Sequence, residues 1–113
     1  RYFMKKIIII LIMLLLCGCG KTNDEKMKEL MAENEYIIVD VRTKEEYSSG
    51  HIKEAINIPY DEINEETELD SNKLIFVYCK SGNRSKYAYE ILKKLGYNVY
   101  DLGSYEDINL DKE

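Results

Sequence analysis

Proline, glycine and histidine are scarce in this sequence of 113 residues. It holds one proline and six glycines, and its single histidine is His51. So little proline and glycine excludes collagen-like and proline-rich low-complexity chains. Charged residues make up 33% of the chain and are separated by regular apolar runs, which argues against intrinsic disorder. The length predicts a single domain.

Basic residues are in the minority outside the first 19 positions. Residues 20–113 contain 13 lysines and arginines against 21 aspartates and glutamates, a net charge of −8. Nucleic-acid binding needs a clustered basic surface, so we expect no nucleic-acid partner. The acidic segment 65–70 lacks the Asp-x-Asp-x-Asp-Gly spacing of a calcium loop. We expect neither a metal site nor a cofactor.

Acidic residues are absent from the N-terminal segment 1–19, of which 15 residues are apolar. A short basic stretch at 4–6 precedes ten apolar residues at 7–16. That run is short for a membrane span, which needs about 20 residues, but typical of a signal-peptide core. Residues 1–3 are interpreted as an upstream extension of a reading frame that begins at Met4.

The apolar run ends in Leu16-Cys17-Gly18-Cys19, which resembles a bacterial lipobox. In that motif a small residue precedes a cysteine that is lipidated and becomes the mature N-terminus. Cys19 fits because Gly18 precedes it, whereas Cys17 follows a bulky leucine. The resemblance implies an exported protein held at the cell membrane by lipid on Cys19, and an uncleaved membrane anchor is the alternative. The implied organisation is a lipoprotein signal peptide (1–18), a tether (19–24) and one domain (25–113).

Cysteine is scarce in the domain as well. The chain has three cysteines, of which Cys17 would leave with the signal peptide and Cys19 would carry lipid. Cys79 is then the only free thiol, and no intramolecular disulfide is expected. An exported protein that keeps one unpaired thiol needs an explanation for it.

Strand and helix patterns alternate through the domain. Apolar, β-branched runs predict four strands, at 36–41, 55–58, 74–79 and 97–102. Helical spacing predicts helices at 24–34, 44–49 and 84–95 and a helical turn at 60–63. Thr43 and Glu46 form a capping box before the second helix, which Gly50 ends. The alternation predicts an α/β fold in which a mostly parallel sheet of about five strands carries helices on both faces.

The segment 79–85, Cys-Lys-Ser-Gly-Asn-Arg-Ser, follows the strongest strand and opens a helix. Ligands of α/β sheets bind at the carboxyl ends of strands, and a helix N-terminus offers unpaired N–H groups. Gly82 and Asn83 tolerate the positive φ values that curl such groups inward, while Lys80 and Arg84 add positive charge. These surroundings lower the pKa of a thiol and predict a thiolate facing an anion. The alternative is a buried cysteine before an ordinary turn.

Two motifs, in order along the chain, resemble the rhodanese family of sulfurtransferases. The first comprises Asp40-Val41-Arg42, Glu46-Tyr47, Gly50-His51-Ile52 and Ala55-Ile56-Asn57-Ile58-Pro59, and the second is Tyr78-Cys79-Lys80-Ser81-Gly82-Asn83-Arg84-Ser85. Together they cover roughly residues 25–110. The resemblance implies a rhodanese-like fold with a persulfide on Cys79. It also implies a substrate cradle made by the N–H groups of Lys80, Ser81, Gly82, Asn83 and Arg84.

The family resemblance implies a sulfurtransferase that moves sulfane sulfur through Cys79. The donor would be a small thiosulfate-type anion, which Lys80 would attract, and the acceptor a thiol, cyanide or a protein. Four residues separate Cys79 from Arg84, as in sulfur-transferring members, whereas related phosphatases and arsenate reductases have a loop one residue longer. The alternative is a non-catalytic module that binds or relays sulfane sulfur or an oxyanion for a protein partner.

The roles of three residues in the first motif are left open by the resemblance. His51 is either a general base or part of a structural turn, the usual place of Gly-His-Ile in this family. Asp40 and Arg42 either shape the pocket or form a buried ion pair with a residue such as Glu46.

The end of the chain departs from the family pattern. Ser104 stands where the family commonly has a second glycine, and the last helix is expected to be cut short after Ile108. We therefore expect a less secure sheet edge there. Tyr60 and Tyr105 are candidates for the border of the pocket.

Overall fold

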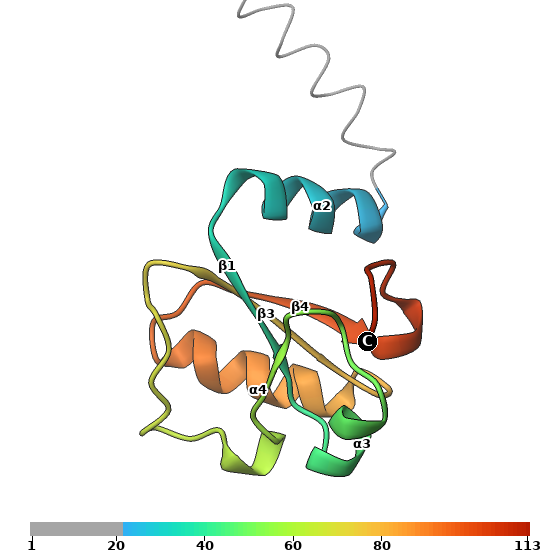
Figure 1. Cartoon of the computed structure of the whole chain (residues 1–113). Helices are drawn as coiled ribbons and strands as arrows, with labels where there is room; N and C mark the ends of the chain where they lie inside the picture. Colours follow the sequence, from blue (N-terminus) through green and yellow to red (C-terminus); the bar gives the residue numbers. More distant parts are fainter. Residues whose placement is uncertain (1–21) are drawn as a thin grey trace, which may run out of the picture.

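The computed structural model describes residues 22–113, which form a central sheet with helices on either side (Figure 1). The predicted signal peptide and Cys19 lie outside the described residues, and lipidation stays a prediction. Within residues 22–113, no helix is both long enough and apolar enough to cross a membrane.

The described elements alternate between helix and strand, as predicted. In chain order they are α2 (Asn23–Glu33), β1 (Tyr36–Asp40), α3 (Lys44–Ser49), β2 (Ile56–Asn57), the 3-10 helix η1 (Tyr60–Glu62), β3 (Leu74–Cys79), α4 (Asn83–Lys94), β4 (Val99–Ser104) and the 3-10 helix η2 (Tyr105–Asp107). The strands lie in the order β2-β1-β3-β4, and every neighbouring pair is parallel. The predicted α/β fold is confirmed, with four strands in the described residues.

Two hydrophobic clusters cover the two faces of the sheet, and α2 and α4 lie on opposite sides (Figure 1). Alternate residues of β3 face opposite ways, so Ile75 and Val77 pack with Ala88 and Leu92 of α4. Phe76 packs in the other cluster, with Met27 of α2. The prediction of helices on both faces is therefore confirmed.

Two strands differ from their predicted bounds for local reasons. The strand expected at 55–58 is only two residues long, because the N–H of Ala55 closes a turn onto the carbonyl of Ile52 and Pro59 has no N–H to donate. The strand expected from residue 97 begins at Val99. The N–H of Tyr97 still bonds the carbonyl of Leu92 around Gly96 (φ 99°), which is a Schellman ending of α4.

Strand β3 is one of the two inner strands of the sheet, with β1 on one side and β4 on the other. Cys79 is its last residue and pairs with Ser104, the last residue of β4. A register shift between Val77 and Tyr78 brings Gly103 opposite Tyr78. The loop after Cys79 therefore leaves the sheet beside the end of β4.

The chain after η2 returns to the segment that follows α3. The N–H of His51 donates to the carbonyl of Glu113, and the N–H of Glu113 donates to the carbonyl of His51, both at 2.8 Å. The N–H of Lys53 also donates to the carbonyl of Asp111 at 2.8 Å. The final helix is short, as expected, and this antiparallel contact follows it.

Candidate active site

Cys79 lies at the carboxyl end of β3 with none of its surface exposed. Its sulfur accepts a hydrogen bond from the backbone N–H of Gly82 at 2.9 Å. Gly82 is in the left-handed region (φ 97°), which turns the loop back over the sulfur and starts α4 at Asn83. The predicted strand, loop and helix therefore enclose the cysteine.

Ser85, in the first turn of α4, contributes a hydroxyl within hydrogen-bond distance of the Cys79 sulfur. Its hydroxyl oxygen lies 3.6 Å from the sulfur and 3.1 Å from the carbonyl oxygen of Gly82. Ser85 is itself fully buried. The sequence prediction included this serine in the loop motif but gave it no role.

The loop lowers the pKa of the Cys79 thiol. Burial by itself raises the pKa, but the hydrogen bond with the Ser85 hydroxyl and those from the backbone N–H groups of Ser85, Gly82 and Ser81 outweigh it. The thiol pKa therefore lies below its ordinary value, as is typical of reactive cysteines.

Arg84 of the loop is paired with Glu46 of α3. Its two terminal nitrogens lie 2.9 and 3.2 Å from the two carboxylate oxygens, and both side chains are about one-quarter exposed. The hydrogen bond with Arg84 holds the pKa of Glu46 down at about 2, although burial acts in the opposite direction. Glu46 also completes the predicted capping box with Thr43. Arg84 and Glu46 are 38 residues apart, and no pattern in the sequence predicts that they pair.

The remaining loop residues form the rim of the cradle. The side chains of Lys80, Ser81 and Asn83 are exposed, and their backbone continues into α4. The carbonyl of Lys80 points to β4, where it accepts a hydrogen bond from the Ser104 hydroxyl at 2.7 Å. The structure thus brings together the five predicted cradle residues and Cys79.

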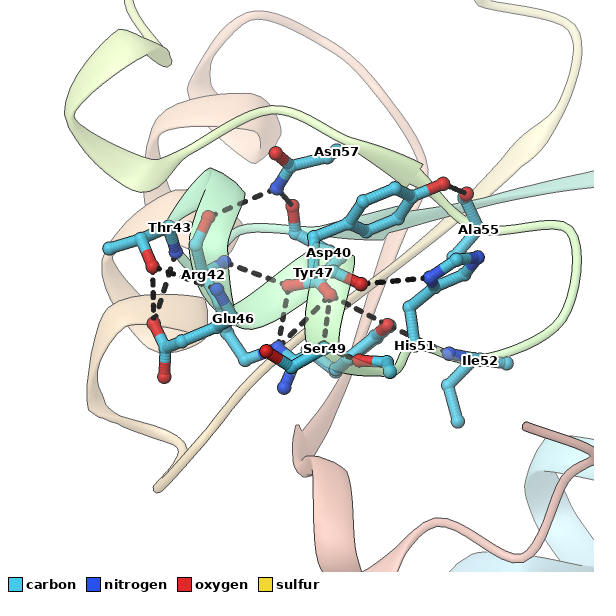
Figure 2. A network of polar contacts seen from close by, with 12 residues as sticks. Asp40, Arg42, Thr43, Glu46, Tyr47, Ser49, His51, Ile52, Ala55 and Asn57 are labelled. Carbon is cyan, nitrogen blue, oxygen red and sulfur yellow. Dashed lines mark hydrogen bonds and ion pairs between the residues drawn. The ribbon is translucent and has the colours of Figure 1, made fainter. Parts of the chain in front are cut away.

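Asp40 and Arg42 form a buried ion pair with each other (Figure 2). The Arg42 side chain bonds both carboxylate oxygens, with its shortest contact at 2.6 Å, and also donates to the carbonyl of Gly50 at 2.6 Å. The Tyr78 hydroxyl donates to Asp40 at 2.8 Å. The expected buried ion pair therefore forms between Asp40 and Arg42 themselves and not with Glu46, which is paired with Arg84.

His51 is held by Tyr47 of helix α3 (Figure 2) and by Glu113 at the end of the chain. Its Nδ1 lies 2.9 Å from the carbonyl oxygen of Tyr47, and its ring stacks on the Tyr47 ring at 3.9 Å. Its Nε2 lies 3.8 Å from the carboxylate of Glu113. These contacts hold the turn at 50–52 against α3 and the end of the chain. Tyr78, which accepts the N–H of Ile52, and Arg42, which donates to the carbonyl of Gly50, hold the same turn.

The two candidate border tyrosines lie in different places. Tyr60 of η1 is partly exposed and packs edge-to-face on Tyr87 of α4 with ring centres 5.9 Å apart. It therefore lies beside the helix that the loop opens. Tyr105 instead stacks beneath the Arg42 guanidinium, 4.2 Å from the ring centre, in the Asp40 network. Within residues 22–113, no cluster of histidine, cysteine and acidic residues is arranged to hold a metal ion.

Comparison with known proteins places this fold and loop in one family. The model of the rhodanese-like domain matches residues 23–111. The chain therefore belongs to the rhodanese-like domain family. A solved structure described as a rhodanese with anions from Escherichia coli superposes with a TM-score of 0.63 at 37% identity, covering 69% of this chain and 96% of that one.

Several relatives are named as sulfurtransferases. Thiosulfate sulfurtransferase PspE of Escherichia coli (strain K12) is 40% identical over 78 residues, which cover 66% of this chain and 75% of that protein. Thiosulfate:glutathione sulfurtransferase of Saccharomyces cerevisiae is 33% identical, covering 74% of this chain and 73% of that protein. Other relatives are much longer than the matched segment. The match spans only 18% of the probable molybdopterin-synthase adenylyltransferase of Porphyra purpurea. The family supports sulfurtransferase chemistry.

Proposed function

We propose that this chain is a sulfurtransferase that carries sulfane sulfur as a persulfide on Cys79. The observation that carries the proposal is the Cys79 sulfur, which sits at the end of the central strand and accepts the Gly82 N–H in a loop closed by Arg84. The names of relatives that match most of their own length support the same chemistry.

In the first half of the reaction the donor is a thiosulfate-type anion. The Cys79 thiolate attacks the outer sulfur of thiosulfate, a bond forms between these two sulfurs, and the sulfur–sulfur bond of the donor breaks. Sulfite leaves with the bonding electron pair, so Cys79 carries one additional sulfur and a single negative charge. The N–H groups of the loop and the exposed Lys80 favour such an anion.

In the second half a nucleophilic acceptor attacks the terminal sulfur. With cyanide, a carbon–sulfur bond forms, thiocyanate leaves, and the electron pair of the broken bond returns to Cys79 as thiolate. With a thiol or protein acceptor in its thiolate form, the product is the acceptor persulfide. No oxidant or reductant is consumed in either half, because sulfur moves as a neutral atom between nucleophiles.

Mass measurement of the full chain tests this proposal. Incubation with thiosulfate is expected to add the mass of one sulfur atom to the wild type and nothing to Cys79→Ser, and cyanide is then expected to release thiocyanate and restore the starting mass. If the chain gains no sulfur and hydrolyses an aryl phosphate, the proposal is wrong. Sulfur gain without turnover would instead identify a relay module, a role consistent with a relative named putative sulfur carrier protein YrkF in Bacillus subtilis (strain 168).

We further propose, from the sequence motif alone, that the protein is exported and held at the membrane by lipid on Cys19. A radiolabelled fatty acid fed to producing cells is expected to label the wild type and not Cys19→Ala. Labelling that survives in Cys19→Ala but is lost in Cys17→Ala would move the lipid to the other cysteine.

A further inference from the structure

Ser104 occupies the position at which a hydroxyl can reach the Cys79 loop from the neighbouring strand. It is the last residue of β4 and pairs with Cys79, the last residue of β3. Its hydroxyl donates to the backbone carbonyl of Lys80 at 2.7 Å. The residue immediately after the cysteine is therefore attached to the sheet by a side chain.

This hydrogen bond fixes the orientation of one peptide group. The carbonyl of Lys80 and the N–H of Ser81 belong to the same planar trans peptide, so they point in opposite directions. With the carbonyl held toward β4, the N–H of the same peptide points away from β4, and this Ser81 N–H is one of the backbone groups that lower the pKa of Cys79.

We propose that Ser104 is a positioning residue for the Cys79 loop, whose hydroxyl orients the Lys80–Ser81 peptide so that the Ser81 N–H faces the sulfur. A glycine at this position has no hydroxyl and cannot make this bond. The proposal deepens the sulfur-transfer function, since the same N–H group would face the persulfide, but the geometry concerns the cysteine alone.

The charged groups around Cys79 are unchanged by a substitution at Ser104. They come from the loop and from each element beside it: Lys80 of the loop, Arg84 of α4, Glu46 of α3, Asp101 of β4 and the Asp40–Arg42 pair at the end of β1. Asp101 accepts the N–H of Gly103 at 2.9 Å and stays on its own strand. A change in the ionisation of Cys79 in a Ser104 variant would therefore report on the peptide orientation.

The test is the pH profile of Cys79 alkylation by iodoacetamide in the full chain, followed at the Cys79 peptide by mass spectrometry. Ser104→Ala is expected to raise the midpoint by roughly half to one pH unit, the effect of one weakened hydrogen bond to the thiolate, with about three- to tenfold slower alkylation below the midpoint. Ser104→Thr is expected to restore the wild-type midpoint because it keeps the hydroxyl. Ser104→Ala and wild-type profiles that superimpose would overturn the proposal.

Two controls separate orientation from general loosening of the fold. Ser49→Ala removes another serine hydroxyl that donates to a backbone carbonyl, at 3.0 Å in α3, and is expected to leave the midpoint unchanged. Ser104→Val matches the shape of Ser104→Thr without the hydroxyl, so this pair gives the answer even if Ser104→Ala folds poorly. If Ser104→Ala shifts the midpoint but the wild type takes up no sulfur from thiosulfate, this inference holds and the proposed function is wrong.

Discussion

The guanidinium of Arg84 forms two hydrogen bonds with the carboxylate of Glu46, at 2.9 and 3.2 Å. Arg84 belongs to the loop that encloses Cys79, whereas Glu46 lies in α3 and also accepts the N–H of Thr43 at 3.1 Å. One carboxylate therefore supports the start of a helix and the closing residue of the cysteine loop. The two motifs read separately from the sequence are joined at this pair.

Glu46→Gln is expected to destabilise the protein in a pH-dependent way. The folded pKa of Glu46 is about 2, below the value of about 4.3 for an unfolded glutamate, so its contribution is fully present above about pH 4.3 and is lost as pH falls through about 2. We expect a loss of about 1–2 kcal/mol at pH 7, after allowance for partial exposure, in the free energy of unfolding measured with urea.

The neighbouring Glu45 offers a matched control for this prediction. It lies in the same first turn of α3 and its side chain is exposed. Glu45→Gln is expected to change the free energy of unfolding by no more than about 0.5 kcal/mol. Equal losses for the two variants, or a Glu46→Gln loss that persists unchanged at pH 2, would contradict the assigned pairing.

Asp40→Ala is expected to be severely destabilising. It leaves the buried Arg42 charge without its partner and the Tyr78 hydroxyl without its acceptor. Loss of one partner of a buried ion pair costs about 3–5 kcal/mol, a large share of the stability of a small domain. The measurement is the midpoint of urea unfolding followed by circular dichroism.

The exposed pair between Lys28 and Asp24 of α2, 3.6 Å apart, provides the comparison. Lys28→Ala is expected to cost no more than about 0.5 kcal/mol. Asp40→Asn, which keeps a side-chain acceptor, should fall between the two and remain measurable if Asp40→Ala does not fold. A small cost for Asp40→Ala, comparable with that of Lys28→Ala, would show that Arg42 finds other partners.

His51→Asn is expected to leave sulfur transfer essentially unchanged. The Nδ1 contact of His51 is with the carbonyl of Tyr47, and an asparagine amide can replace that donor. The rate of thiocyanate formation from thiosulfate and cyanide should stay within about twofold of the wild type, because loss of a general base would instead cost about 100-fold or more. A large rate loss with an altered pH profile would assign His51 a direct part in the chemistry.

Local patterns were sufficient to predict the central strand and the cysteine loop. The uninterrupted apolar run at 74–79 can only be buried, and Gly82 before a helical pattern defines the turn that encloses the sulfur. The capping box of Thr43 and Glu46 was predictable because its two residues are three apart. Such signals depend only on neighbours along the chain.

The long-range polar contacts could not be predicted in the same way. Glu46 and Arg84 are 38 residues apart, as are Asp40 and Tyr78, and nothing in the local pattern selects these partners among the many charged residues. Ser104 illustrates the same point, since it stood out in the sequence only as a departure from a glycine. Its contact with the Lys80 carbonyl depends on the register of β3 and β4.

The central position of β3 has a consequence for the timescales of motion around the cysteine. Because β1 pairs with one edge of β3 and β4 with the other, the amides of β3 are expected to exchange with solvent only when the sheet itself opens. The exposed residues Ser81 and Asn83 belong to a surface loop, where local opening is easier. Cys79 thus lies at the boundary between a strand whose amides exchange slowly and a loop that opens more easily. The loop can therefore adjust to an added sulfur atom while strand β3 stays in position.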